Sequence, residues 1–256
     1  MGSVAGSNVR FQCLAAAQRQ QEGGIKHPFV VVPGGMSVTY DGLQFERLGH
    51  ASVRIETDDG TVIYIDPWTE IFDETPQDGD IVIVTHDDFD HYDPDGIEAV
   101  AGPDALVAIY EDVDTADLDR DVTSLPYEGE VSLAGVTAET MPAYNRSDGD
   151  HVDEEGNPFH ADGEVIGLLL SINGVTVFYP SDTDFLDHHQ SVTADVFLPP
   201  IGGHFTMDRH EAAEFARSVD PELVLPIHYD TFEPIETDQA AFADELEADG
   251  YRVELF

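Results

Sequence analysis

The first half of the chain contains short segments whose hydrophobic pattern is typical of β-strands. A strand with one buried face alternates apolar and polar residues, and residues 43–48 do so. Asp59-Gly60 favours a hairpin turn between two such segments. Residues 81–84 are all apolar, so we expect this strand to be covered on both faces. The predicted strands of this half are residues 43–48, 52–56, 62–65, 81–84, 106–109 and 136–141, with a short helix from about Asp95.

The second half repeats this pattern and adds helices. Asn173-Gly174 predicts another hairpin turn. Asp208, followed three residues later by Glu211, is typical of a capping box and predicts a helix from there to about Val219. Strands are expected at residues 168–172, 175–179, 196–198, 223–226 and 252–256, and a last helix at residues 237–248. Two strand-rich halves that each end in helix predict two sheets packed face to face with helices outside.

Charge divides the chain near residue 35. The charged residues of the segment before that point are Arg10, Arg19, Lys26 and Glu22, a net charge of +2, whereas the whole chain has −43. Because a chain this acidic rarely begins with a basic segment, we expect residues 1–35 to be a poorly ordered N-terminal extension. Residues 36–256 are then expected to form one domain. A native arm that packs on this domain is the alternative.

The acidity of the chain restricts its partners. Asp and Glu number 53 against 10 Lys and Arg, and Lys26 is the only lysine. Such a surface repels the phosphate groups of nucleic acids and anionic membranes, so we expect neither as a partner and expect a small-molecule substrate instead. Dense negative charge repels itself at ordinary ionic strength and is screened in molar salt, which favours a protein from a halophile. An acidic protein of an ordinary cell is the alternative.

The apolar content and the single cysteine set further limits. Hydrophobic residues make up 41% of the chain, which is enough for a full core. Cys13 alone allows neither a disulfide framework nor a thiolate zinc cluster. No apolar run approaches the roughly 18 residues of a membrane helix, and the N-terminus lacks the pattern of a signal peptide. We therefore expect a cytoplasmic protein.

A dense group of polar residues follows the apolar strand at residues 81–84. It places His86, Asp88, Asp90 and His91 close together directly after the strand end. Histidines and carboxylates without thiolates suit zinc, iron or manganese, and three protein ligands with an open position for water are typical of a catalytic ion. Further candidate ligands lie at other predicted strand ends: His50, Asp66, His160, Asp182 and His228. The sequence therefore predicts a metal site built where several strands end.

This stretch resembles the metal-binding loop of the metallo-β-lactamase-fold hydrolases, which reads His-x-His-x-Asp-His after a strand. The resemblance covers most of residues 43–232. Matching blocks are Leu48-Gly49-His50-Ala51-Ser52, Ile65-Asp66-Pro67, Pro142-Ala143-Tyr144-Asn145, Phe159-His160, Ser181-Asp182-Thr183-Asp184, Gly202-Gly203-His204-Phe205-Thr206-Met207 and Pro226-Ile227-His228-Tyr229. They are similar to a branch that contains metal-dependent hydrolases and relatives of the ascorbate phosphate lactonases. The resemblance implies an α/β fold, a four-layer αββα sandwich, with a two-metal site between the sheets.

The resemblance also implies which residues hold the two ions. The ligands of the first would be His86, Asp88, His160 and Asp182. The ligands of the second would be Asp90, His91, Asp182 and His228, so that Asp182 bridges both ions. Asp66 would fix a ligand imidazole through its other ring nitrogen. His50 either assists there or is a packing histidine.

One departure from the family pattern concerns Asp88, where most members have histidine. A carboxylate can bind zinc but favours harder ions such as manganese or iron. The flavo-diiron branch of the same fold carries a carboxylate at this place and uses iron, but this chain has no room for the flavodoxin domain of that branch. We therefore expect two divalent ions, zinc first, with manganese or iron as alternatives. In the opposite interpretation, Asp88 is an acidic substitution that weakens or abolishes the first site.

The other histidines are assigned by their positions. His160 matches the family's Phe-His block and is preferred over His151, which lies in the same acidic loop. His204 is a candidate catalytic residue that would contact the substrate. The remaining histidines are expected away from the site: His188 and His189 on a solvated turn, His27 in the extension and His210 on an acidic helix face.

The implied activity is that of a metal-dependent hydrolase acting on an ester, lactone, amide or phosphodiester of a small molecule. Two ions lower the pKa of a shared water toward neutrality, which makes a metal-bound hydroxide available at pH 7. Asp90 would orient this nucleophile and carry a proton to the leaving group. The alternative is a metal-binding or ligand-sensing protein of the same fold that has lost turnover through Asp88. The sequence names neither the substrate nor the oligomeric state.

Overall fold

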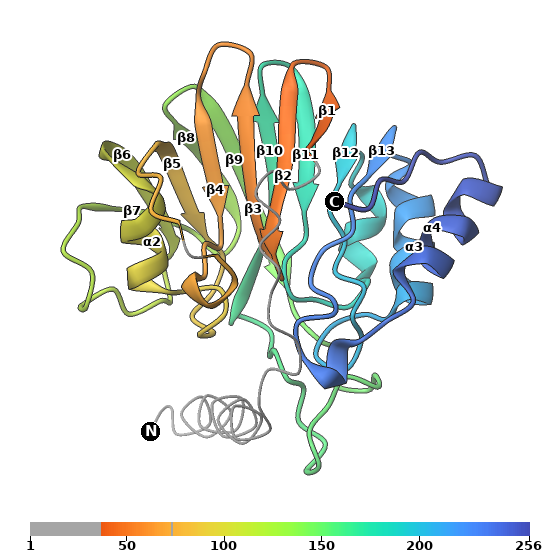
Figure 1. Cartoon of the computed structure of the whole chain (residues 1–256). Helices are drawn as coiled ribbons and strands as arrows, with labels where there is room; N and C mark the ends of the chain where they lie inside the picture. Colours follow the sequence, from red (N-terminus) through yellow and green to blue (C-terminus); the bar gives the residue numbers. More distant parts are fainter. Residues whose placement is uncertain (1–36, 73) are drawn as a thin grey trace.

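A computed structural model describes residues 37–72 and 74–256 of the chain (Figure 1). The predicted extension at residues 1–35 lies outside the described residues. Within them, two β-sheets face each other and helices lie on the outer sides. The predicted αββα sandwich is therefore confirmed.

The first sheet is built by the N-terminal part of the described residues, and its strands lie side by side in chain order. They are β1 (Val38–Tyr40), β2 (Leu43–Gly49), β3 (Ser52–Thr57), β4 (Val62–Ile65), β5 (Gly79–Val84), β6 (Ala101–Tyr110) and β7 (Val122–Leu125). Pairing is antiparallel from β1 to β4 and parallel from β4 to β7. The apolar run Ile81–Val84 in β5 is wholly buried, as expected of a parallel strand covered on both faces.

The second sheet is built by the later strands. They are β8 (Gly129–Leu133), β9 (Val136–Ala143), β10 (Val165–Ile172), β11 (Val175–Tyr179), β12 (Val196–Phe197) and β13 (Leu223–Val224). The order in the sheet is β13-β12-β11-β10-β9-β8. Pairing is antiparallel from β8 to β11 and parallel from β11 to β13. Both sheets thus combine antiparallel hairpins with a parallel section, and the parallel strand ends carry the residues discussed below.

The core has two parts. Apolar side chains of both sheets form one buried cluster between them, including Ile83 of β5 and Leu168 of β10. A second cluster lies between the second sheet and the helices α3 (Arg209–Val219) and α4 (Gln239–Ala248), where Phe215 of α3 contacts Phe197 of β12 at 4.8 Å between ring centres. On the other side, the short helix α2 (Pro94–Val100) contacts β5. Burial of these apolar side chains is the main force that holds the layers together.

Local signals in the sequence hold in part. The turn at Asn173-Gly174 has φ angles of 51° and 92°, the left-handed conformations that a tight hairpin between β10 and β11 requires. The expected capping box at α3 is only half formed. Asp208 accepts hydrogen bonds from the backbone N–H groups of residues 210 and 211, but the Glu211 carboxylate accepts from the backbone of Phe185 instead. This glutamate therefore ties α3 to the loop after β11.

The strand predictions need three additions and one correction. Strands β1, β7 and β8 were not expected, because they are short and have no clear apolar alternation. The predicted last strand at residues 252–256 is wrong. Only Val253 forms a bridge, with Val224 of β13, so the C-terminal residues touch the sheet edge without extending it. Three short 3₁₀ helices complete the described elements: Thr69–Ile71, Asp187–Ser191 and Glu233–Ile235.

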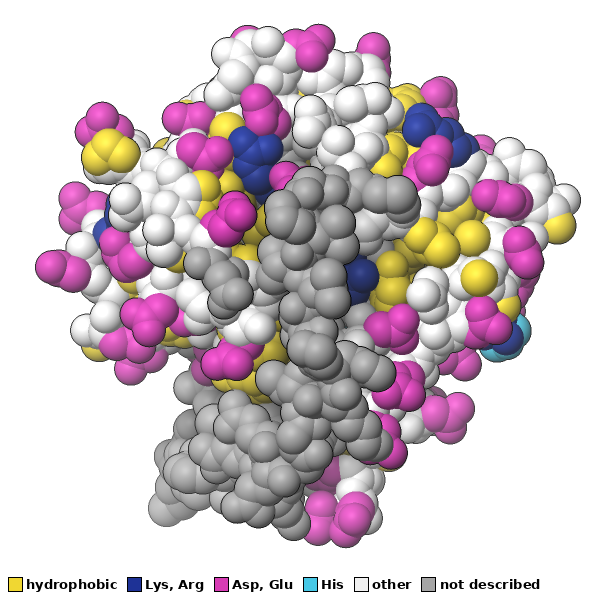
Figure 2. Space-filling model, viewed as in Figure 1, with side chains coloured by type: hydrophobic (Ala, Val, Ile, Leu, Met, Phe, Trp, Pro, Cys, Tyr) yellow, Lys and Arg dark blue, Asp and Glu magenta, His cyan; other side chains and the backbone are white. Residues whose placement is uncertain are grey.

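The surface is acidic, as the composition requires. Figure 2 shows Asp and Glu side chains spread over the visible part of the described residues, with few Arg side chains among them. None of the described helices combines the length and apolar character needed to cross a membrane.

Candidate metal centre

Candidate ligands from both sheets meet at one end of the sandwich. Each follows the end of a strand: His50 after β2, Asp66 after β4, the segment from His86 to His91 after β5, Asp182 after β11 and His228 after β13, with His160 in the loop between β9 and β10. All of these histidines are buried, as are Asp66, Asp90 and Asp182. The rigid strands therefore fix the backbone positions at which the candidate ligands begin, and only short loop segments remain to orient the side chains.

The first group of ligand atoms belongs to His86, Asp88 and His160, which lie within 4.8 Å of one another. Nε2 of His160 is 3.2 Å from Oδ2 of Asp88, and Nε2 of His86 is 3.8 Å from the same oxygen. Asp88, the residue that departs from the family pattern, thus points into the cluster. Its geometry fits a ligand.

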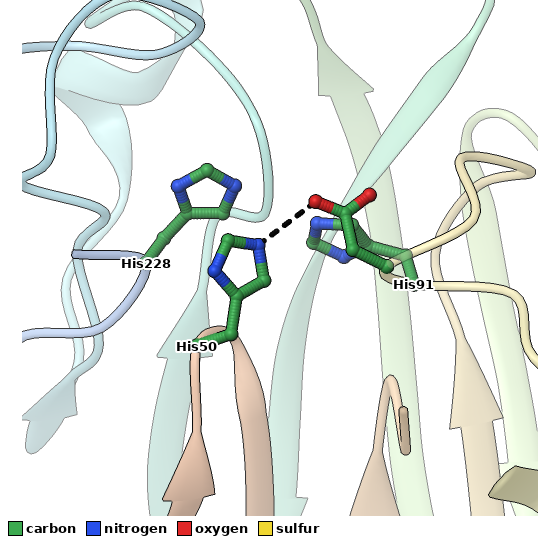
Figure 3. A group of neighbouring side chains, drawn as sticks. His50, His91 and His228 are labelled. Carbon is green, nitrogen blue, oxygen red and sulfur yellow. Dashed lines mark hydrogen bonds and ion pairs between the residues drawn. The ribbon is translucent and has the colours of Figure 1, made fainter. Parts of the chain in front are cut away.

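The second group belongs to His50, Asp90, His91 and His228, whose ligand atoms also lie within 4.8 Å of one another. Figure 3 shows the imidazoles of His50, His91 and His228 near one another. Nε2 of His50 donates a hydrogen bond to Oδ2 of Asp90 at 2.9 Å. Nδ1 of His50 lies 3.0 Å from Oγ1 of Thr231. His50 is therefore a member of the polar cluster and not a packing histidine.

Asp182 connects the two groups. Its Oδ1 lies 3.5 Å from Nε2 of His91, and its Oδ2 lies 3.0 Å from Nε2 of His228 and 3.5 Å from Nε2 of His160. One carboxylate thus faces imidazoles from both groups. This is the place expected of a bridging ligand.

Asp66 supports His91 from behind. The Asp66 carboxylate is fully buried and accepts hydrogen bonds from the backbone N–H and the hydroxyl of Thr85 and from the hydroxyl of Tyr179. It also lies 2.8 Å from Nδ1 of His91. A proton held on Nδ1 by this contact leaves the Nε2 lone pair of His91 directed at Asp182. The expected role of Asp66 fits this arrangement.

The cluster contains the donor atoms that a cation needs. Nε2 of His86, His91 and His228 is buried and makes no well-aligned hydrogen bond among the described residues, although His91 and His228 lie close to the Asp182 carboxylate. A buried polar atom without a partner costs about 1–3 kcal/mol, and such atoms are rare in native proteins. Three of them beside buried carboxylates fit ligation of divalent ions.

The electrostatics of the cluster also favour a cation. Burial opposes the ionisation of Asp182, but the imidazoles of His228 and His91 outweigh it and hold the pKa of this carboxyl well below its usual range. Burial lowers the pKa of His86 to about 4, so this imidazole is neutral at pH 7 and its lone pair can ligate. For His160 the hydrogen bond to Asp88 and the charge of Asp182 outweigh burial and raise the pKa to about 9. The carboxylates thus attract positive charge to the space that an ion would fill.

The loops that carry the ligands are held together across the sandwich. The half-buried Arg47 side chain donates to the carbonyl groups of His50 at 3.0 Å and Tyr229 at 2.9 Å, and the backbone N–H of His228 donates to the same His50 carbonyl. The backbone of residue 202 also packs closely against residue 228. Only glycine fits there, because a Cβ on Gly202 would lie 2.4 Å from the His228 carbonyl oxygen. His50, Asp66, Ser181 and His228 all have left-handed backbones with φ of 46–60°. Non-glycine residues in this conformation cluster at functional sites.

The structure shows which of the remaining histidines lie in the ligand cluster and which lie outside it. His160 joins the ligand cluster, whereas Nδ1 of His151 lies 2.6 Å from Asp184 in another group with Glu211. His204 is exposed and contacts the ring of Phe159 at 5.2 Å; the structure does not bring it among the ligands. His188 is exposed and His210 pairs with Glu245 on the surface of α3, both as expected, and His27 lies outside the described residues.

The prediction for His189 is wrong. Its side chain is buried and stacks on Phe215 of α3 at 5.0 Å between ring centres, so it belongs to the core and not to a solvated turn. Burial lowers its pKa to about 3, which keeps it neutral there.

Sequence reasoning also missed residues that support the ligands. Oδ1 of Asn145 accepts from the backbone N–H of His160 at 2.9 Å and lies 3.1 Å from its Nδ1. Nδ2 of Asn145 donates to Asp184. Asn145 stands in one of the sequence blocks quoted above, just after β9, but a lone asparagine has no pattern that assigns this role. Thr231 beside His50 was missed for the same reason.

The comparisons with known proteins agree with this geometry. A family model described as "Beta-lactamase superfamily domain" matches residues 44–228. A "UPF0173 metal-dependent hydrolase" of Methanosphaerula palustris is 32% identical over 204 residues, which cover 78% of this chain and 89% of that protein. A solved structure from Parabacteroides distasonis has a TM-score of 0.72 and 26% identity over 86% of this chain and 97% of that one. Igni18, described as a metallo hydrolase from Ignicoccus hospitalis, has a TM-score of 0.68 and 25% identity over 84% and 94%.

The matched region contains strands β3 to β13, nearly all of β2, and every candidate ligand from His50 to His228. The chain therefore belongs to the metallo-β-lactamase superfamily, in its family of metal-dependent hydrolases.

Proposed function

We propose that the chain hydrolyses an ester, lactone, amide or phosphodiester of a small molecule, with two divalent ions held around Asp182. The observation that carries this proposal is the shared carboxylate. Asp182 lies between two groups of donor atoms, and unpartnered imidazole nitrogens surround it. Membership of a family of metal-dependent hydrolases supports hydrolysis as the reaction type.

The donors divide into two sets. The first ion would be held by His86, Asp88 and His160 and the second by Asp90, His91 and His228, with Asp182 common to both. Ions bound in this way lower the pKa of a water molecule toward neutrality and polarise the carbonyl or phosphoryl oxygen of a substrate. The number of imidazoles favours zinc, while the Asp88 carboxylate makes manganese or iron the alternative.

Asp90 would orient the attacking water and pass a proton to the leaving group. Its carboxylate is fixed by the 2.9 Å contact with Nε2 of His50, whose other ring nitrogen is held by Thr231. Burial opposes the ionisation of Asp90, but the contact with His50 outweighs it and lowers the pKa of this carboxyl. Asp90 is therefore an anion at neutral pH, and its orientation is set before a substrate arrives.

The net charge of the chain bears on the salt concentration at which it works and on the class of its substrate. A net charge of −43 supports activity in concentrated salt and a small-molecule substrate, since nucleic acids and anionic membranes would be repelled. The lactone in the substrate range rests on the sequence blocks shared with relatives of the ascorbate phosphate lactonases.

The test combines metal analysis with turnover. The full chain is reconstituted with zinc, manganese or iron in molar KCl, its metal content is measured by mass spectrometry, and ester, lactone, amide and phosphodiester substrates are assayed. We expect about two ions per chain and turnover that Asp182→Asn abolishes. The matched control is Asp104→Asn, an exposed carboxylate outside the cluster. Two bound ions without turnover on any class would contradict hydrolysis and support the metal-binding or ligand-sensing alternative.

A further inference from the structure

Among the described ligands, the two carboxylates of residues 88 and 90 are the side chains that retain most contact with solvent. The Asp88 side chain is 26% exposed and the Asp90 side chain 13%, whereas the other carboxylate and imidazole ligands are at most 5% exposed. A substrate must approach the ions where protein atoms do not cover them. Residues 88–90 therefore mark the side on which the scissile bond arrives.

Aromatic rings border this side. Phe89 stands between Asp88 and Asp90 in the chain, and its ring lies 5.6 Å from Trp68 and 6.4 Å from Phe232. Trp68 and Phe232 are 5.9 Å apart, and each lies 5.6 Å from the ring of His50. Trp68 is buried, while Phe89 and Phe232 are half-buried. We call Trp68, Phe89 and Phe232 the aromatic flank.

A second group of aromatic rings lies next to His160 in the chain. Phe159 directly precedes His160, whose Nε2 lies 3.2 Å from Asp88. The rings of Phe205 and His204 lie 5.0 Å and 5.2 Å from that of Phe159, and His204 is exposed. Aromatic rings thus accompany both Asp90, through His50, and Asp88, through His160.

Among the described residues, no lysine or arginine makes a hydrogen bond or ion pair with Asp88 or Asp90. Lys26, the only lysine, lies outside them. Every described arginine is engaged with carbonyl groups or carboxylates elsewhere: Arg47, Arg54, Arg120, Arg146, Arg209, Arg217 and Arg252. Arg47, beside the cluster, is half-buried, and its guanidinium is bound to the carbonyls of His50 and Tyr229. An anionic group on a substrate would therefore meet carboxylates without an arginine or lysine to balance it.

We propose that the natural substrate is electrically neutral and carries an aryl or bulky alkyl group next to its scissile bond, and that this group packs on Phe89 and Phe232 of the aromatic flank. This inference rests on the proposed function and narrows its substrate range to neutral esters, lactones or amides, away from phosphodiesters. Half-buried rings gain most from an apolar group that covers them, because their remaining apolar surface leaves water. Trp68 packs against the rings of both Phe89 and Phe232.

The experiment compares matched substrates on the full chain reconstituted with metal in molar KCl. The pair is 4-acetylphenyl acetate, which is neutral, and 4-carboxyphenyl acetate, which has the same ring with a negative charge. Bis(4-nitrophenyl) phosphate represents phosphodiesters. We expect kcat/KM to be at least about ten-fold higher for the neutral ester, since a mismatched group in a specificity site typically costs this much.

Variants of Phe232 test whether the aryl group of the substrate packs on this side chain. Phe232→Ala should lower kcat/KM on the neutral aryl ester about ten-fold, mainly through KM, at unchanged metal content, and Phe232→Leu should restore part of it. The matched control is Phe256→Ala, a half-buried phenylalanine at the C-terminus, which should leave kcat/KM unchanged. A preference for either anionic substrate, or full activity of Phe232→Ala on the aryl ester, would overturn this inference while leaving hydrolysis intact. Metal-loaded protein without turnover on any substrate would instead overturn the proposed function, and this inference with it.

Discussion

The contact between Asp66 and His91 can be tested by a change of one atom, Asp66→Asn. In the native protein Oδ2 of Asp66 meets Nδ1 of His91 and the hydroxyls of Thr85 and Tyr179, and Oδ1 accepts from the backbone N–H of Thr85. An amide has only one acceptor oxygen. If that oxygen keeps the backbone N–H, its NH₂ group faces Nδ1 of His91, which must then accept and move its proton to Nε2.

A proton on Nε2 removes the lone pair that faces Asp182 at 3.5 Å. Loss of a supporting contact of this kind typically lowers metal affinity by 10–100-fold, or about 1.4–2.7 kcal/mol. If the amide instead keeps three contacts on its oxygen, its NH₂ group faces a buried N–H, and the unfolding free energy falls by about 1–3 kcal/mol. We expect the first outcome to dominate, because hydroxyl groups can rotate and a backbone N–H cannot.

The assay is competition for zinc against a chromophoric chelator, together with thermal unfolding of the metal-free protein in molar KCl. The control is the exposed Asp104→Asn, which removes the same charge from the surface. We expect a lower affinity at the second ion and a melting temperature of the metal-free variant close to the parent's. An affinity equal to that of the parent would refute the idea that Asp66 sets the tautomer of His91.

Three further predictions follow from the same structure. Asp88→Ala should lower the metal content from two ions to one, and Asp88→His should strengthen the preference for zinc over manganese and iron; equal metal content in the parent and Asp88→Ala would show that Asp88 is not a ligand. Arg47→Met should lower the unfolding free energy by about 3 kcal/mol or more, since two charge-assisted hydrogen bonds to the carbonyls of His50 and Tyr229 are lost, as measured by denaturant titration. Dilution from molar KCl into dilute buffer should lower the melting temperature strongly, because repulsion between like charges reaches only ~3 Å in 1 M salt but ~30 Å in 0.01 M salt. An unchanged melting temperature would contradict the halophile interpretation.

The positions of the ligands could be predicted because strand ends and ligand residue types coincide in the sequence. The apolar run before His86 marks a buried parallel strand, and such a strand needs an exit where polar side chains begin. The fold followed from the same alternation and from the resemblance of several blocks to one family. Asp182 as the link between both groups was implied by that resemblance, and the structure places it there.

What could not be predicted depends on contacts between distant segments. His189 has the composition of a polar turn, and only the position of Phe215 on a helix some 25 residues later shows that it is stacked in the core. Strands β7 and β8 contain few apolar residues and form because β6 and β9 offer them hydrogen bonds. The support of His160 by Asn145 depends on a loop that returns to the end of β9. The hydrophobic periodicity of the sequence cannot predict such a contact between distant segments.

The backbone contact between residues 50 and 228 joins the two sheets at the end where the ligands meet. His86, Asp90 and His91 belong to the first sheet, whereas Asp182 and His228 belong to the second. Ions bound to both sets would therefore act as a clasp between the halves of the sandwich, and neither half would hold them alone. Binding that requires the folded state stabilises it by mass action, by about 4 kcal/mol when free metal exceeds its dissociation constant a thousand-fold. The supply of metal in the cell would then set how much of this acidic chain stays folded, and not only how much of it is active.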